Sequence, residues 1–341
     1  MAVVALASAL LLLAWILAVR LRGRHRAGRI ARQEETWRRA MHEAMERPVA
    51  QKLPAISEGD LPEFLMMWNR LRETQRGPAA DNMAQLLRDN GLDKRAMALL
   101  RAGSVRSRLI AMSTLGFLGA EEAWTALEAI AGSSEAMLSF AAARALLRIE
   151  PRRALDALTP AIVQRNDWSV ARLGCMFTEL GPALVTPSLT TMLVSRPRAG
   201  LDRVVKLARF GERNRIAPIM RGWLSSSDNP DIIMAALDYV DDERELPWAK
   251  GAAVHTEWRV RMAAARAIGK VGSREELQTL LQLLRDPVWW VRYHAAQALT
   301  RLHGMTPDEL RLIRVKARDS FAADMLAHAL AEMPLRKIKF L

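Results

Sequence analysis

The chain has 341 residues, of which half are apolar, and 50 lysines and arginines against 37 aspartates and glutamates give it a formal net charge of +13. No stretch alternates valine, isoleucine and threonine as strands do, which favours an all-α fold. A single cysteine, Cys175, excludes an internal disulfide framework and a cysteine-based zinc site.

The N-terminal segment, MAVVALASALLLLAWILAV, contains no charged side chain over residues 1–19. A helix of this length extends about 28 Å, close to the ~30 Å hydrocarbon core of a bilayer. Trp15 near its end suits a membrane interface. A cleaved signal peptide is the alternative, and it is disfavoured because no basic residue precedes the apolar run and arginines follow it. We therefore predict an uncleaved transmembrane helix over residues 1–19.

Arginines are concentrated directly after this apolar segment. Residues 1–39 hold eight arginines against Glu34 and Glu35, a balance of +6, which leaves +7 for the other 302 residues. The positive-inside rule places the N-terminus outside and the body in the cytoplasm, so we expect a single-pass membrane protein with a cytoplasmic body. Binding of DNA by these arginines is the weaker alternative. The arginines expected to contact anionic lipid headgroups are Arg20, Arg22, Arg24, Arg26 and Arg29.

Two regions separate the basic segment from the rest of the chain. Residues 20–59 are predicted to form a basic helix that projects from the membrane, followed by a linker that contains two prolines and a glycine. In residues 60–103, the stretch GDLPEFLMMWNRLRET is typical of an amphipathic helix capped by Asp60, and a pair of helices ended by glycines follows. We predict that residues 60–103 form a cap over the first unit of a repeat array.

Residues 104–341 repeat themselves with a period of about 31 residues. The stretch WRVRMAAARAIGKVG (258–272) aligns with WWVRYHAAQALTRLHG (289–304). Weaker copies occur upstream at the same spacing, and a closing pair of helices is predicted downstream. Such a period is typical of a helical solenoid. The aligned positions are 108, 139, 171, 202, 233, 261 and 292.

The pattern Asp-Pro-x-x-x-Val-Arg-x-x-Ala-Ala-x-Ala-Leu at residues 286–299 resembles the HEAT repeat, and the resemblance covers about residues 90–331. It implies a right-handed superhelical α-solenoid of about seven to eight helical pairs, preceded here by the transmembrane helix. It also implies that Arg261, Asp286 and Arg292 form a structural ladder between repeats. The arginine is absent from the middle repeats, so the repeat count between residues 150 and 250 stays open.

Tryptophans recur at one position of the repeat, two residues before a valine. Trp168, Trp258 and Trp289 occupy it, and Trp290 follows directly. At the start of a second helix these rings are expected near the edge of the concave surface, and tryptophan is enriched in binding hot spots. The alternative is a hydrophobic staple, in which each ring packs on the turn between its own helices. We take all four tryptophans as candidates for binding a partner.

Motifs for catalysis or for a cofactor are absent from the sequence. The six histidines lack metal-ligand spacing, and there is no G-x-S-x-G motif, phosphate-binding glycine loop or dinucleotide fingerprint. We expect His294 to be half-exposed or bonded to a partner group, the acidic run DYVDDERE (238–245) to be solvated, and Cys175 to be an unreactive thiol in the core. The sequence therefore predicts no enzyme, no cofactor and no metal.

These features are typical of a binding scaffold. We expect a membrane-tethered cytoplasmic HEAT-repeat protein that binds a partner protein. Resemblance to membrane-anchored bacterial HEAT proteins implies a location in the bacterial inner membrane and suggests an accessory subunit of an envelope or exopolysaccharide glycosyltransferase. One alternative is a nucleic-acid or nucleotide-binding module, which the modest charge of the body disfavours. The other is a HEAT-like lyase-type enzyme, which requires a concave pocket with convergent polar groups.

Overall fold

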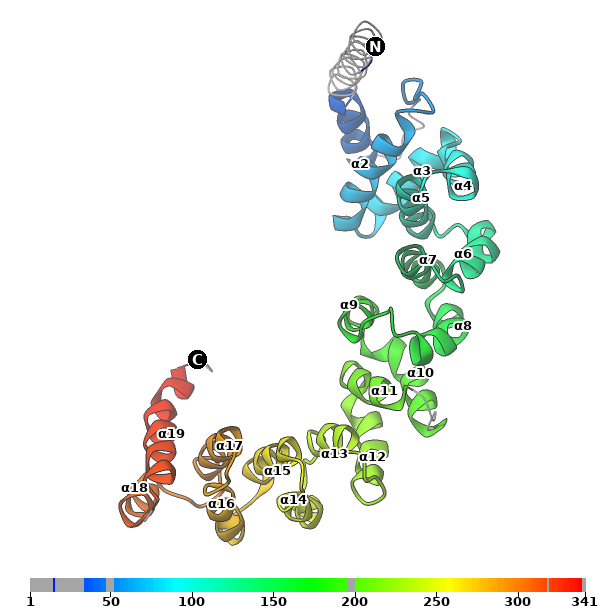
Figure 1. Cartoon of the computed structure of the whole chain (residues 1–341). Helices are drawn as coiled ribbons and strands as arrows, with labels where there is room; N and C mark the ends of the chain where they lie inside the picture. The colour runs from blue at the N-terminus through cyan, green and yellow to red at the C-terminus, as the bar shows by residue number, and fades with distance from the viewer. Residues whose placement is uncertain (1–14, 16–33, 47–51, 196–199, 318, 339–341) are drawn as a thin grey trace, which may run out of the picture. The chain divides into compact units, whose positions relative to one another are not determined.

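A computed structural model of the chain describes residues 15, 34–46, 52–195, 200–317 and 319–338. The regular elements in these ranges are all helices (Figure 1). A single isolated bridge, between Ser273 and His303, is the β-type pairing found in the described part. The chain divides into two compact units, residues 1–158 and 159–341. The predicted all-α fold is confirmed.

The described part of the first unit contains a helix over residues 34–46. The elements after it are α2 (Leu61–Thr74), α3 (Pro78–Asp89), α4 (Leu92–Ala102), α5 (Val105–Leu118), η1 (Glu121–Ala123), α6 (Trp124–Ala131) and α7 (Ala136–Ile149), and α8 (Pro151–Gln164) crosses the division between the units. The three helices predicted between residues 60 and 103 are therefore present. Asp60 precedes α2 as expected, but its carboxylate accepts the Ser57 hydroxyl at 2.6 Å and makes no capping bond to the helix.

The second unit continues the succession of short helices. Its elements are α9 (Val170–Leu180), α10 (Pro182–Ser195), α11 (Leu201–Leu207), η2 (Ala208–Phe210), α12 (Arg213–Leu224), α13 (Pro230–Leu237), η3 (Glu243–Glu245), α14 (Leu246–Ala252), α15 (Trp258–Val271), η4 (Arg274–Glu276), α16 (Leu277–Leu283), α17 (Trp289–Leu299), α18 (Pro307–Lys316) and α19 (Ser320–Ile338). The last two form the predicted closing pair. Buried residues from Ile233 to Ala329 make one continuous core cluster, as expected when no pair can bury its apolar faces alone.

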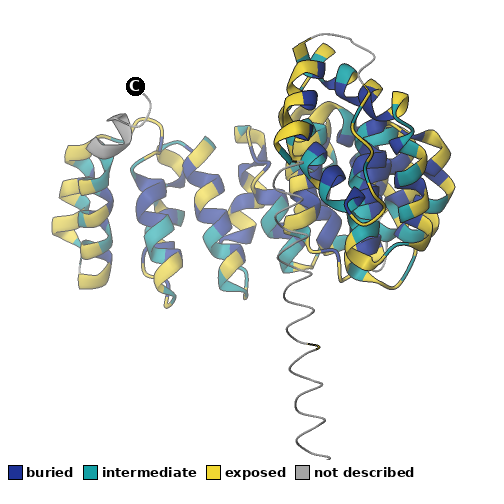
Figure 2. Ribbon diagram, turned by 90° about the horizontal axis from the view of Figure 1, so that it is seen from above, coloured by how far each residue is buried: buried dark blue, intermediate teal, exposed yellow. Residues whose placement is uncertain are grey.

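Helices pack as pairs, and the pairs follow the predicted register. Within the described residues of each unit, α4 packs on α5, α6 on α7, and each even-numbered helix from α10 to α18 on the odd-numbered helix after it. In Figure 2 the buried residues lie on the helix faces that meet and the exposed residues face outward. The aligned positions 108, 139, 171, 202, 233, 261 and 292 each lie in a second helix, from α5 to α17. The period read from the sequence is thus confirmed, including the repeats that lack the arginine.

Glycine allows second helices of neighbouring repeats to approach closely. Gly269 of α15 faces α17, where a Cβ on it would lie 2.5 Å from the Cα of Ala298. Gly116 of α5 faces α7 in the same way, where a Cβ would lie 2.9 Å from the Cα of Ala145. Real Cβ atoms do not approach backbone this closely, so either helix would have to move if the glycine gained a side chain. The two units therefore use the same helix contact.

The helix over residues 34–46 packs on the first unit. It buries one face, made of Trp37, Ala40, Met41 and Ala44. The Trp37 ring meets Phe64 of α2 edge-on, with 5.3 Å between ring centroids. This helix does not project away from the body, because its apolar face is buried against α2.

The predicted localisation is corrected by the structure. No helix among the described residues is long and apolar enough to cross a bilayer. Even α19, with 19 residues, carries Asp324, Glu332 and two basic residues. The assignment as a single-pass inner-membrane protein with a cytoplasmic body is therefore overturned for the described part of the chain. Apart from Trp15, residues 1–19 lie outside that part, as do the predicted lipid contacts Arg20, Arg22, Arg24, Arg26 and Arg29.

Candidate functional site

Arg261 and Asp286 make the predicted ladder contact in the second unit. Arg261 Nε donates to Asp286 Oδ2 at 2.6 Å, and Nη2 donates to Oδ1 at 3.0 Å. Asp286 Oδ1 also accepts the backbone N–H of Val288 at 2.8 Å, which orders the turn before α17. The hydrogen bond from Arg261 to Asp286 raises the pKa of the guanidinium above its ordinary value. This ion pair therefore joins one repeat to the next.

Arg292 repeats part of this arrangement. Arg261 Nη1 donates to the carbonyl oxygens six and five residues before it, at 2.8 and 2.9 Å. Arg292 Nη1 donates to the two equivalent carbonyl oxygens, at 2.8 and 3.0 Å. The position 31 residues after Asp286 is Ala317, so Arg292 has no aspartate there and instead lies 5.4 Å from the ring centroid of Phe321. Both arginines hold a turn to the helix that follows it.

The acidic run 238–245 is engaged in ion pairs, contrary to the expectation that it is simply solvated. Asp241 accepts Arg213 Nε at 2.8 Å and also pairs with Lys270. These contacts, that of Arg213 above all, hold the pKa of the Asp241 carboxyl below its ordinary value. Glu245 is buried and accepts an arginine of α12 at 2.7 Å. The carboxylates thus connect successive repeats, and no group of potential metal ligands occurs in the described ranges.

Cys175 is exposed, so the prediction of a core thiol is wrong. The helix α9 buries Leu173, Met176 and Phe177. An α-helix turns about 100° per residue, which puts these three on one face and Cys175 about 200° from Leu173, on the opposite face. The apolar residues of this sequence stretch therefore extend beyond the one helix face that is buried.

The predicted tryptophans differ in their surroundings. Trp168 is completely buried, Trp258 is half-buried against the core, and Trp289 and Trp290 are 41% and 51% exposed. Tryptophans at the same position of different repeats therefore differ in how far they are buried. The burial of Trp168 favours the staple alternative for that residue, whereas Trp289 and Trp290 lie on the surface.

Trp289, Trp290 and Tyr293 form an aromatic cluster on α17. The Trp289 ring stacks on Tyr293 with 5.2 Å between centroids, and Trp290 meets Trp289 edge-on at 4.7 Å. His328 of α19 contacts Tyr293 at 6.2 Å. The rings touch one another, which gives an ordered aromatic surface and not an open cage for a cation. The adjacent His294 is half-buried as expected, and burial with two nearby arginines lowers its pKa.

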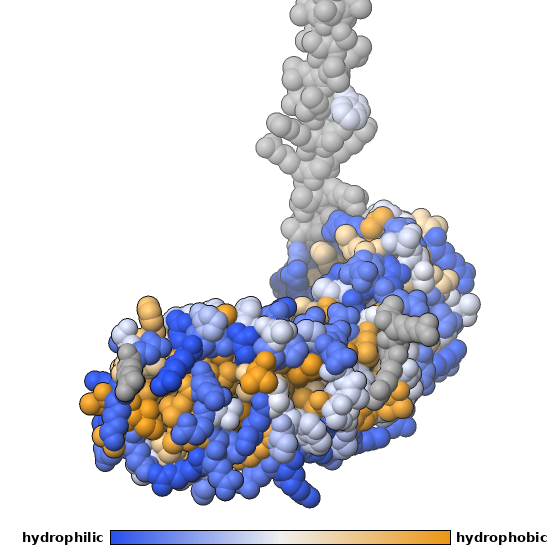
Figure 3. All heavy atoms as spheres, turned by 60° about the horizontal axis from the view of Figure 1, so that its bottom comes forward, coloured by the Kyte–Doolittle hydropathy of each residue, from blue (hydrophilic) through white to orange (hydrophobic). Residues whose placement is uncertain are grey.

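Apolar side chains are also exposed on the last pair of helices. Leu312 and Val315 of α18 are 53% and 77% exposed, and Phe321 of α19 is 65% exposed. Figure 3 shows apolar side chains gathered at this end of the second unit, among charged ones. Exposed apolar side chains are informative when they gather, because gathered ones are typical of interaction sites.

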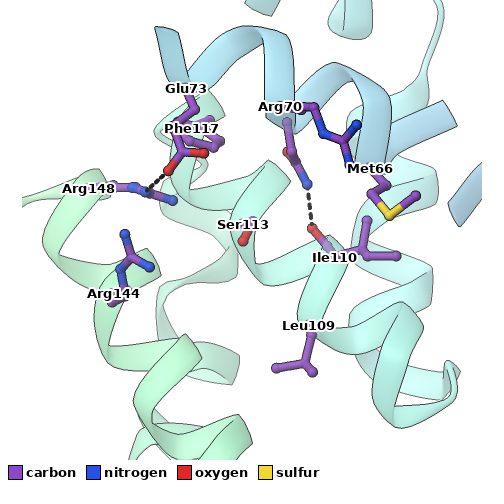
Figure 4. Close-up of a pocket in the computed structure, with 10 residues that line it drawn as sticks. Met66, Arg70, Glu73, Leu109, Ile110, Ser113, Phe117, Arg144 and Arg148 are labelled. Atoms are coloured by element: carbon purple, nitrogen blue, oxygen red, sulfur yellow. Dashed lines mark hydrogen bonds and ion pairs between the residues drawn. The ribbon is translucent and has the colours of Figure 1, made fainter. Parts of the chain in front are cut away.

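The first unit contains a pocket that the sequence did not indicate. It has a volume of about 400 Å³ and lies between α2, α5 and α7 (Figure 4). We name it the arginine pocket after Arg70, Arg144 and Arg148, which line it. The Arg148 guanidinium lies 4.0 Å from the ring centroid of Phe117 and 4.0 Å from Glu73 Oε1.

The arginine pocket has a weak signal in the sequence. Arg144 and Arg148 are four residues apart in a second helix, so they share one helix face. The third arginine, Arg70, comes from a helix outside the repeated pattern, and only the packing of α2 on α5 brings it to the same place. Sequence reasoning that compared equivalent positions of the repeats therefore missed this site.

Comparison with known proteins agrees with the repeat assignment. Residues 232–300, which run from within α13 to just beyond α17, match the family model of HEAT repeats, in agreement with the resemblance. None of the curated proteins matches the chain significantly. Among solved structures, the chain is similar to a crystal structure of an engineered protein, with 15% identity, a TM-score of 0.37, and coverage of 87% of this chain and 95% of the other.

Proposed function

We propose that the chain is a HEAT-repeat scaffold that binds another protein, and that the aromatic cluster of Trp289, Trp290 and Tyr293 is the centre of its binding surface. HEAT repeats generally mediate contacts between proteins. The observation that carries the proposal is the exposure of two adjacent tryptophans, 41% and 51%. Tryptophan contributes disproportionately to binding energy where a partner buries it, and here two exposed tryptophans are adjacent.

The order of the cluster supports this role. Because Trp289 stacks on Tyr293 and Trp290 leans on Trp289, the rings lose little rotamer freedom when a partner covers them. Tyr293 and His328 lie beside Glu332, which pairs with His328 at 3.7 Å and gives the surface a polar edge. An aromatic centre with a polar edge is the usual composition of a protein interface.

We propose no catalytic role for the chain. Arg261, Asp286 and Asp241, which are among its most polar buried or half-buried groups, are engaged in ion pairs within the fold. The partner is proposed as a protein with an apolar or aromatic centre in its own surface.

Affinity capture with matched variants tests the proposal. The purified chain and Trp289→Ala/Trp290→Ala are immobilised at equal density, and proteins retained from a lysate are identified by mass spectrometry. Trp248→Ala is the control, because Trp248 on α14 is also 41% exposed but lies outside the cluster. We expect a retained protein to be lost with the double variant, by about tenfold or more, and kept with the control. Equal retention by all three proteins would contradict the proposal.

A further inference from the structure

The arginine pocket concentrates positive charge in a small volume. Arg70, Arg144 and Arg148 line it together with a single carboxylate, Glu73, so the lining has a net charge of +2. The Arg148–Glu73 contact is long, at 4.0 Å, and the Glu73 side chain is 63% exposed. No ion pair or hydrogen bond joins Arg70 to another residue in the described ranges. A guanidinium presents paired N–H groups that match a carboxylate, so such a site favours acidic ligands.

Two walls of the pocket supply donors. Arg144 and Arg148 are one helical turn apart on α7, a rise of about 6 Å along its axis. Figure 4 shows them on one side of Ser113, with Arg70 beside Met66 on the other side. Alternate residues of an extended chain are about 6.6 Å apart, so a peptide with acids at every second position fits this spacing.

Apolar side chains complete the lining. Met66, Leu109, Ile110 and Phe117 face the same volume. They provide contacts for an apolar residue that lies between two acidic ones. A volume of about 400 Å³ accommodates a few side chains and not a folded domain.

The aromatic ring of the pocket, Phe117, is covered by arginines of the chain itself, which disfavours nucleic acid as the ligand. Arg148 covers the Phe117 ring at 4.0 Å from its centroid, and Arg72 lies 5.5 Å from the same centroid. The ring therefore has little open face on which a base could stack, and single-stranded nucleic acid depends on such stacking.

The geometry points to a docking site for a short acidic segment of a partner protein, with carboxylates at Arg70, Arg144 and Arg148 and an apolar residue between them. This inference goes beyond the proposed function and is independent of the aromatic cluster, because the pocket is built from α2, α5 and α7 alone.

Fluorescence anisotropy on the full chain tests this inference. The probe is a fluorescein-labelled peptide, Gly-Glu-Leu-Glu-Leu-Glu-Gly, and a second probe has glutamine in place of each glutamate. Arg70→Gln/Arg144→Gln is compared with Arg101→Gln/Arg152→Gln, whose arginines are exposed, belong to the same unit and lie outside the pocket lining. Both variants lose the same charge, so the comparison separates the pocket from the overall basic character of the chain.

We expect the acidic probe to bind at least about tenfold more tightly than the glutamine probe, and the pocket variant to lose about tenfold in affinity while the control variant loses less than about twofold. Trp289→Ala/Trp290→Ala should bind the acidic probe as the wild type does, which keeps this test separate from that of the proposed function. Equal loss in the two arginine variants, or equal binding of the two probes, would overturn the inference. Displacement of the peptide by a single-stranded oligonucleotide that binds more tightly would assign the pocket to nucleic acid and overturn it as well.

Discussion

Arg261 holds Asp286 through two parallel hydrogen bonds, and the two residues come from neighbouring repeats: one from α15, the other from the turn that precedes α17. Both side chains are mostly buried, at 15% and 6% exposure. The pair constrains how the turn meets the preceding repeat, because both guanidinium N–H groups must face the carboxylate at once.

Asp286→Ala should lower the free energy of unfolding by about 2–4 kcal/mol, because it leaves the Arg261 guanidinium buried without its carboxylate. Arg259→Ala is the control, since Arg259 is 49% exposed and solvent screens its pair with Glu257, which should contribute little to stability. Chemical denaturation followed by circular dichroism measures both. Equal destabilisation by the two variants would show that the pair does not connect the repeats.

Gly269→Ala should destabilise the second unit by about 1–3 kcal/mol even though alanine is the better helix former. The new Cβ would lie 2.5 Å from the Cα of Ala298, so α15 and α17 would have to separate. Gly222→Ala is the matched control in helix α12, where a Cβ meets nothing within 4 Å, and it should be neutral or stabilising by up to about 1 kcal/mol. Thermal unfolding curves distinguish the two, and a Gly269→Ala protein as stable as wild type would refute the close helix contact.

Asp241→Asn should destabilise the chain in a pH-dependent manner. The pKa of the Asp241 carboxyl is held below its ordinary value, chiefly by Arg213, which means that the folded state stabilises the ionised carboxylate. Its stabilising contribution is therefore present above the unfolded pKa of about 4 and is lost as the pH falls through the lower folded pKa.

At pH 7 we expect Asp241→Asn to cost about 0.5–1 kcal/mol, and we expect the difference from wild type to shrink below pH 4. Asp228→Asn, at an exposed position, should change stability little at any pH. Denaturation midpoints measured from pH 3 to pH 7 provide the comparison. A constant difference between Asp241→Asn and wild type over this range would be inconsistent with the ion pairs.

Replacing a buried tryptophan should destabilise the fold far more than replacing an exposed one. Trp168 is completely buried, so Trp168→Ala should cost about 3–5 kcal/mol. Trp290→Ala should cost less than about 1 kcal/mol, because half of that ring is already in solvent. Melting temperatures of the two variants give the answer. Similar melting temperatures would remove the distinction between a core tryptophan and a surface one.

Cys175 should react in the native state. The thiol is exposed on α9, so a thiol reagent such as 5,5′-dithiobis(2-nitrobenzoic acid) should label one group per chain without denaturant. Cys175→Ser should abolish the labelling and leave the melting temperature unchanged within about 1–2 °C. Labelling that appears only after unfolding would show that the Cys175 thiol is buried in the native state.

By itself, the sequence determined the helical pairs and their register. Position 108 and its equivalents up to 292 lie in second helices because small and apolar residues must recur with the repeat for each pair to bury its faces on the next. The HEAT resemblance, and not the period itself, implied that Asp286 pairs with one of the repeated arginines, and the structure shows that its partner is Arg261.

Only the tertiary structure decided which side chains reach the surface and which converge. Trp168 and Trp289 share a repeat position, yet one is buried and the other exposed, because exposure depends on what the neighbouring helices cover. Arg70 joins Arg144 only through the packing of α2 on α5, which no periodicity encodes. A repeat fixes what each helix buries against its equivalents, whereas a site depends on the residues in which the repeats differ.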